Sequence, residues 1–305
     1  MRPPDRLRLG TRRSPLALAQ SELVAEALRE LPSRPEVEIV PIVTLGDRVR
    51  GSLVELGGKG LFTQELEEAL RRGDLDLAVH SLKDLPASTP EDLALAAFPS
   101  RAACWDVLVS AVAASVEELP EGAVVLTGSL RRRGQLLARR PDLRVTDVRG
   151  NVATRLERWR DSGAAAVVVA AAGLERLGLT EPPAHRLDPQ TFLPAPGQGT
   201  LAVQTRSGSE AEALCRQIDH RETATAAMAE RRIVRAFGGD CRLPLAAWAR
   251  REGEAWSVSA WIGKADGTRS LRADAHDEDA TQAADHCVHQ LREQGAEELL
   301  PELPK

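Results

Sequence analysis

The sequence contains no long hydrophobic run. Its longest apolar stretch, Ala164–Leu174, is too short to span a bilayer. The segment Met1–Gly10 carries charges and prolines and lacks the apolar centre of a signal peptide, so we expect a cytoplasmic protein that does not enter a membrane. The cysteines are far apart and form neither a C-x-x-C pair nor a zinc-type Cys/His spacing, which is typical of a reducing compartment rather than of a disulfide framework.

An excess of positive charge is also missing. The formal net charge is -5 and the pI is about 5.8, which argues against a nucleic-acid-binding protein with a general basic face. Lysine is rare and arginine is the default cation. Lys83, next to Asp84 at the end of an apolar run, therefore indicates a position that requires a compact ammonium group. The alternative is a surface turn that carries these two residues without a function.

The 305 residues predict two or three domains, the first of which is α/β. Short apolar runs alternate with helical patterns, which indicates a parallel sheet. The expected elements are strand 7–9, a helix from Pro15 to about Leu31 capped by Ser14, strand 37–43, a long glycine-rich loop 45–60, helix 62–72 and strand 75–79.

A second α/β lobe is expected over residues 100–199. After a segment rich in proline and glycine, the lone strand-like run Leu201–Thr205 predicts that the chain returns to the first lobe. The first domain is therefore predicted to comprise residues 1–99 and 200–216. A long helical stretch, three antiparallel strands and a last helix predict a third, α+β domain over residues 217–305.

Arginines recur where α/β folds place ligands, at the ends of strands and the starts of helices. Each one alone is typical of a solvated surface residue. Together they predict a site for a small ligand with several carboxylates, because each charge-assisted hydrogen bond contributes roughly 1.5 to 3 kcal/mol. The arginines in question are Arg12 and Arg13 after the first strand, Arg131 and Arg132 after Ser129 at a helix start, Arg149 at a strand end and Arg155 one turn into the next helix.

Asp84 and Cys241 are the other candidates. Nearby cations should keep Asp84 ionised, which suits it to hold an N–H donor or a transient positive charge. Cys241 lies in a glycine-bounded loop, where a thiol is accessible, whereas the other cysteines lie in apolar or helical contexts. His80 and Ser81 suggest a hydrolase, but no nucleophile-elbow pattern is present, and a hydrogen-bonded histidine at a strand end is the preferred interpretation.

The order and spacing of these motifs resemble the porphobilinogen deaminase family over nearly the whole chain. The matching segments are T-R-R-S-P-L-A-L, G-G-K-G-L-F, V-H-S-L-K-D-L-P, G-S-L-R-R, R-G-N-V-A-T-R, A-G-L-E-R-L-G, G-Q-G and G-G-D-C. The resemblance implies two lobes of the type II periplasmic-binding-protein kind with the active site in the cleft between them, and a third α+β domain with a small antiparallel sheet. It also implies a monomer and no metal.

The same resemblance implies the chemistry. Porphobilinogen would be condensed stepwise, head to tail and with loss of ammonia, to the linear tetrapyrrole hydroxymethylbilane. Cys241 would carry a dipyrromethane cofactor through a thioether, and Asp84 would contact pyrrole nitrogens and stabilise the cationic azafulvene. By the same resemblance, the residues that would bind the cofactor carboxylates are Lys83, Ser129, Arg131, Arg132 and Arg155. Those that would bind the substrate carboxylates are Arg12, Ser14, Arg149 and Arg155, with assistance from Arg176. Lys59 would belong to a mobile loop over the cleft.

The chain departs from the family pattern at three positions. Glu55 stands where a lysine is common, Gly128 replaces a common serine, and Asp240 replaces a common glycine. Glu55 puts in doubt a role of that loop position in carboxylate binding. The alternative function is a non-catalytic binding protein for small anions on the same two-lobed fold, for which Cys241 would have no use. A weaker alternative is a thiol hydrolase that pairs Cys241 with His220.

Overall fold

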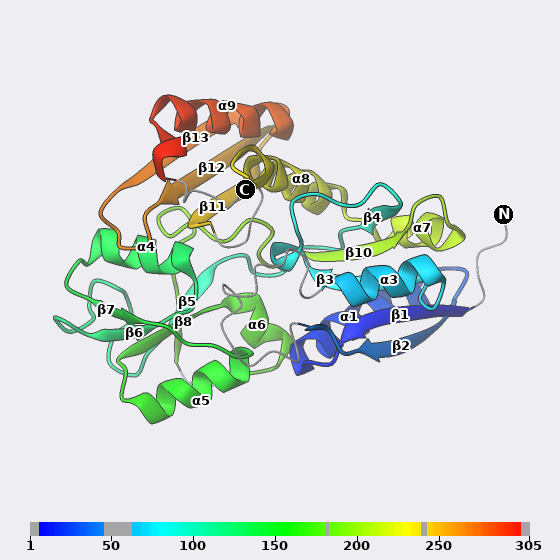
Figure 1. The fold of residues 1–305 in the computed structure, drawn as a ribbon, viewed down its shortest axis with the longest axis horizontal. Helices are drawn as coiled ribbons and strands as arrows, with labels where there is room; N and C mark the ends of the chain where they lie inside the picture. Colours follow the sequence, from blue (N-terminus) through cyan, green and yellow to red (C-terminus); the bar gives the residue numbers. More distant parts are fainter. Residues whose placement is uncertain (1–5, 46–62, 181–182, 239–242, 300–305) are drawn as a thin grey trace. The chain divides into compact units, whose positions relative to one another are not determined.

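The computed structural model describes residues 6–45, 63–180, 183–238 and 243–299 (Figure 1). These residues fall into two compact units. The first unit contains the described residues up to Ala102 together with Thr200–Ala227, and the second contains Ala103–Gly199, Met228–Gly238 and the described residues after 242. The three predicted domains do not correspond one to one to these two units, and their boundaries stay a prediction.

The first unit is built on a five-stranded mixed sheet with the order β2-β1-β3-β10-β4. β1 is parallel to β2 and β3, whereas β10 is antiparallel to β3 and β4. The strands are β1 (Arg6–Arg12), β2 (Glu36–Ile42), β3 (Leu77–Ser81), β4 (Leu93–Ala97) and β10 (Leu201–Arg206), and the helices are α1 (Pro15–Arg29), α3 (Gln64–Arg72), the 3-10 turn η1 (Leu82–Asp84), α7 (Glu210–Cys215) and η2 (Arg216–Ile218).

Side chains alternate between the two faces of this sheet. Leu77 and Val79 belong to the core that includes residues of α1 and α7, whereas Ala78 packs with residues of α3. This is the two-residue period of a strand covered by helices on both faces. The α1 start agrees with its prediction, because the Ser14 hydroxyl accepts a hydrogen bond from the Ala17 amide and Pro15 is the first helical residue.

The second unit contains another five-stranded mixed sheet, with the order β7-β6-β8-β5-β9. Its central strand β8 is buried along its whole length, and its residues contribute alternately to a core with α4 and a core with α5. The elements are β5 (Asp106–Val109), β6 (Val124–Leu126), α4 (Leu130–Arg139), β7 (Arg144–Thr146), α5 (Val152–Ser162), β8 (Ala166–Ala170), α6 (Ala171–Arg176) and β9 (Ala184–Arg186).

The last part of the chain forms a three-stranded antiparallel sheet with the order β11-β12-β13. The helix that follows it buries a row of small and apolar side chains, among them Cys287, whose Sγ donates to the Val258 carbonyl at 3.2 Å. The elements are α8 (Arg221–Ala236), β11 (Leu245–Glu252), β12 (Ala255–Gly263), β13 (Ser270–Asp277), α9 (Ala280–Glu293) and the 3-10 turn η3 (Ala296–Leu299).

The predicted fold class is confirmed: two α/β sheets and a small antiparallel sheet with helices. Three details of the prediction were wrong. The sheet of the first unit is mixed rather than parallel, because β10 runs antiparallel to β3 and β4. The predicted long helical stretch is not continuous but is broken into α7, η2 and α8. Strands β4 and β9 were not anticipated.

Candidate functional site

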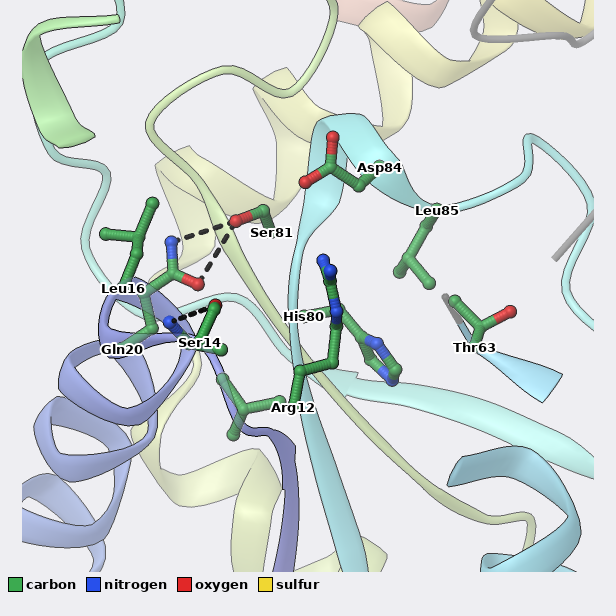
Figure 2. A pocket seen from close by; sticks show the side chains of 11 residues that line it. Arg12, Ser14, Leu16, Gln20, Thr63, His80, Ser81, Asp84 and Leu85 are labelled. Carbon is green, nitrogen blue, oxygen red and sulfur yellow. Dashed lines mark hydrogen bonds between the residues drawn. The ribbon is translucent and has the colours of Figure 1, made fainter. Parts of the chain in front are cut away.

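A pocket in the first unit lies at the edge of the sheet where β1 and β3 end (Figure 2). Because these strands are parallel neighbours, the segments that follow them meet at this edge. The residues that line the pocket come from the end of β1 and the start of α1, the end of β3, η1 and the start of α3: Arg12, Ser14, Leu16, Ala17, Gln20, Thr63, Val79, His80, Ser81, Asp84 and Leu85.

The structure brings together three residues that the sequence proposed from two separate motifs. Arg12 and Ser14 line the same pocket as Asp84. Asp84 is the last residue of η1 and its side chain is exposed, whereas Lys83 beside it is half-buried. The short 3-10 turn directly after β3 explains this placement, since it ends the strand and turns the carboxylate out toward the pocket.

Sequence reasoning missed Gln20, and it set Ser81 aside. Gln20 lies on the buried face of α1, and its amide nitrogen donates to the Ser81 hydroxyl at 2.8 Å, a bond that Figure 2 shows. A signal was present in the sequence, because a glutamine at a core-facing position of a helix must find a partner. The pair fixes the start of α1 against the end of β3, on which Asp84 depends for its position.

His80 was predicted to be a hydrogen-bonded histidine without a role in the site. It is hydrogen-bonded, since its Nε2 lies 3.1 Å from Gln204 Oε1, but it also lines the pocket. Burial lowers the pKa of His80 to about 4, and the hydrogen bond to Gln204 offsets this only in part. The imidazole is therefore neutral at neutral pH.

The buried neutral His80 should make stability depend on pH. Because its folded pKa is below the unfolded value, the unfolded chain binds more protons, and stability is lost as the pH falls from about 6.5 to about 4. Relative to a His80→Asn variant, wild-type protein should lose up to about 3 kcal/mol of its free energy of unfolding between pH 7 and 4. Urea denaturation at several pH values measures this difference. Parallel pH curves for the two proteins would contradict it.

In the second unit, Arg131 and Arg132 converge on Asp106. Arg131 Nη2 donates to Asp106 Oδ2 at 2.8 Å, and Arg132 Nη2 donates to Oδ1 at 2.7 Å. Gln198 Nε2 donates to the same carboxylate at 2.8 Å. Asp106 is fully buried and each arginine is only 4% exposed. Sequence reasoning missed Asp106, although an aspartate beginning an otherwise apolar strand was a signal.

This cluster contains two positively charged side chains and one negatively charged side chain. Burial favours the neutral form of Asp106, but the charges of Arg131 and Arg132 outweigh it and hold the pKa of the carboxyl well below its usual range. Burial also lowers the pKa of Arg131, and Asp106 opposes that shift. One carboxylate therefore faces two guanidinium groups. The Nε atoms of both arginines are buried and have no hydrogen-bond partner among the described residues.

The remaining predicted residues of the second unit lie around helix starts and loops. Ser129 caps α4 by accepting a hydrogen bond from the Arg132 amide. Arg149 is paired with Asp147 at 3.0 Å, and Arg155 donates to the carbonyl of Gly150, the residue that follows Arg149. Arg176 donates to the Gly199 carbonyl at 2.7 Å, and burial lowers its pKa.

One departure from the family pattern has a structural reason. A Cβ atom at Gly128 would lie 2.8 Å from the Val148 carbonyl oxygen and 2.9 Å from a carboxylate oxygen of Asp147. A serine at this position would therefore force the neighbouring backbone to shift. Lys59 and Cys241, together with Glu55 and Asp240, lie outside the described residues.

No helix in the described ranges is long and apolar enough to cross a membrane.

Comparison with known proteins agrees with the family resemblance of the sequence motifs. The family model described as "Porphobilinogen deaminase, dipyromethane cofactor binding domain" matches residues 7–213, and that described as "Porphobilinogen deaminase, C-terminal domain" matches residues 224–296.

Similar proteins include a porphobilinogen deaminase of Xanthomonas axonopodis pv. citri, 48% identical over 97% of this chain and 99% of that protein. Another is a porphobilinogen deaminase of Stenotrophomonas maltophilia, 47% identical over 89% of this chain and 90% of that protein. Among solved structures, an ancestral cationic amino acid solute binding protein is 18% identical, with a TM-score of 0.42 over 70% of this chain and 90% of that one.

Proposed function

The chain belongs to the porphobilinogen deaminase family, and from that membership we propose that it is a hydroxymethylbilane synthase. This transferase condenses porphobilinogen stepwise, with loss of ammonia, to the linear tetrapyrrole. The observation that carries the proposal in the structure is the pocket of the first unit, in which an exposed carboxylate, Asp84, borders the same hollow as the cation of Arg12. The family membership does not favour a non-catalytic anion-binding protein.

The arginine pair of the second unit fits the dipyrromethane cofactor of the family. Arg131 and Arg132 share one carboxylate, so the buried cluster has an excess positive charge and two unpartnered Nε–H donors. A carboxylate of the cofactor would complement both. Ser129, Lys83 and Arg155 complete the proposed set of cofactor-holding residues, and Cys241 is the proposed attachment residue. When bound, the cofactor supplies the free pyrrole carbon that attacks the incoming substrate.

The chain's own residues then have separate roles. Arg12, Ser14, Arg149, Arg155 and Arg176 are proposed to hold the substrate carboxylates, and Lys59 is proposed to belong to a loop that covers the substrate. Asp84 is proposed to accept hydrogen bonds from pyrrole N–H groups and to stabilise the positive charge that develops when ammonia leaves. An ionised carboxylate at this place acts by fixed electrostatics rather than by donating a proton.

The proposal also covers the cellular compartment, the oligomeric state and nucleic-acid binding. We propose that the protein acts in the cytoplasm as a monomer and binds no nucleic acid. The net charge of -5 supports the last point, because general nucleic-acid binding requires a positive surface. Sedimentation of the purified protein, with and without a duplex oligonucleotide, tests the monomer and the absence of binding together.

The activity is tested by incubating the purified protein with porphobilinogen. We expect linear tetrapyrrole and released ammonia, and an intact mass above that of the bare sequence by one dipyrromethane. The mass increment and the activity should both be absent in Cys241→Ser, whereas Cys287→Ser, which changes a buried thiol, should keep both. A wild-type protein of bare mass that remains inactive after incubation with porphobilinogen would refute the proposal.

A further inference from the structure

The hydrogen bonds around His80 have only one consistent direction. Gln204 Nε2 donates to a carboxylate oxygen of Glu67 at 3.2 Å, and a carboxylate can only accept. The amide oxygen of Gln204 is therefore the atom that faces His80, at 3.1 Å from Nε2. Because an amide oxygen can only accept as well, His80 must carry its proton on Nε2. Glu67 thus fixes the tautomer of His80 through Gln204.

This tautomer leaves Nδ1 with a free lone pair. His80 is only 7% exposed, yet it lines the pocket that also contains Arg12, Ser14 and Asp84 (Figure 2). Nδ1 has no hydrogen-bond partner in the part of the chain that the structure describes. Desolvation and the nearby positive charge of Arg12 both disfavour a second proton on the ring. His80 therefore presents a neutral acceptor beside a carboxylate and a cation.

We propose that His80 is a substrate-binding residue whose Nδ1 accepts a hydrogen bond from a pyrrole N–H of porphobilinogen. This inference rests on the proposed function. A neutral N–H fits this acceptor better than the ammonium group of the substrate does, because Arg12 repels a cation and the carboxylate of Asp84 attracts one. A pyrrole N–H is also a donor that cannot protonate the imidazole. Because porphobilinogen has one pyrrole N–H, the pyrrole N–H groups that Asp84 is proposed to contact would then be those of the cofactor, and the positive charge of the substrate would also lie toward Asp84.

Steady-state kinetics of cofactor-loaded variants provide the first test. In His80→Phe, the KM for porphobilinogen should rise about tenfold, as expected for one lost hydrogen bond, with kcat changed less than about threefold. His80→Asn can present an oxygen near the position of Nδ1 and should recover part of the KM. The matched control is Gln204→Leu, which keeps the imidazole and removes its anchor, and it should change KM by no more than about threefold, because the ring then divides between two tautomers. The proposal would be overturned if His80→Phe had the KM of wild type. It would also be overturned if the KM of Gln204→Leu rose as much as that of His80→Phe.

Nitrogen-15 NMR of histidine-labelled protein provides a second test that does not require an active variant. Wild-type protein at pH 7 should show His80 with a protonated Nε2 and an unprotonated Nδ1. Adding porphobilinogen to Asp84→Ala, in which turnover should be strongly slowed, should shift the Nδ1 resonance in the direction of an accepted hydrogen bond. A protonated Nδ1, or a resonance that porphobilinogen leaves unmoved, would refute the inference even if the enzyme is active. Failure of the proposed function would instead appear as a wild-type protein without turnover.

Discussion

An Asp84→Ala variant should keep its fold and its covalent cofactor while kcat for porphobilinogen falls roughly 100- to 1,000-fold, the loss typical of one preorganised electrostatic group. The side chain of Asp84 is exposed at the end of η1, so its removal leaves no cavity in the core. Its carboxylate borders the pocket together with Arg12, where it is placed to oppose positive charge on a bound pyrrole. Single-turnover kinetics of the cofactor-loaded variant measure the effect.

Two further variants separate charge from shape at this position. Asp84→Asn retains a hydrogen-bond acceptor without the charge, and it should lose nearly as much activity as Asp84→Ala, because stabilising a cation requires the negative charge. Asp74→Ala removes an exposed carboxylate of the same unit that pairs with Arg72 outside the pocket, and it should keep wild-type kcat. An Asp84→Asn variant with more than about a third of the wild-type kcat would contradict an electrostatic role and leave only hydrogen bonding.

Local signals in the sequence were sufficient for the starts of helices. Ser14 and Pro15 predicted the start of α1, and α4 starts where Ser129 indicated a helix start; both serines cap their helices through contacts with residues three positions away. The arginines at strand ends and helix starts were located by the same reasoning. Each of these features depends on a few neighbouring residues, so the sequence alone contains the information.

Contacts between distant parts of the chain were beyond this reasoning. The acceptor shared by Arg131 and Arg132 is Asp106, 25 and 26 positions away, and the anchor of His80 is Gln204, 124 positions away. The second case depends on β10 pairing antiparallel with β3, which also made the expected parallel sheet a mixed one. Periodicity reports which face of a strand is buried and not which strand lies beside it.

An Asp106→Asn variant should be about 3 to 5 kcal/mol less stable than wild-type protein, because it leaves two buried guanidinium groups without a counter-charge. The size is nearly unchanged by this substitution, so the effect isolates charge from packing. Asp92→Asn is the matched control: Asp92 pairs with Arg71 at 2.6 Å, but it is exposed, so its loss should change the free energy of unfolding far less than the loss of Asp106 does. Urea denaturation of the three proteins at pH 7 measures the difference.

The pH dependence of the Asp106 variant gives the sign of the effect independently. The folded pKa of Asp106 lies below its unfolded value, so its contribution to stability is present above about pH 4 and is lost as the pH falls further. The stability difference between wild type and Asp106→Asn should therefore be largest at neutral pH and shrink in acid. A difference that is independent of pH would instead indicate a packing defect.

The same variant also tests whether the arginine pair holds the cofactor. Asp106→Asn raises the excess positive charge of the cluster, so a bound cofactor carboxylate should stabilise the variant more than it stabilises wild-type protein. The measurement is the gain in the free energy of unfolding from the cofactor-free to the cofactor-loaded form of each protein. In the control, Asp92→Asn, this gain should equal that of wild type. If loading stabilises all three proteins equally, the charge of the pair is satisfied within the fold, and Arg131 and Arg132 would be structural residues rather than ligands of the cofactor.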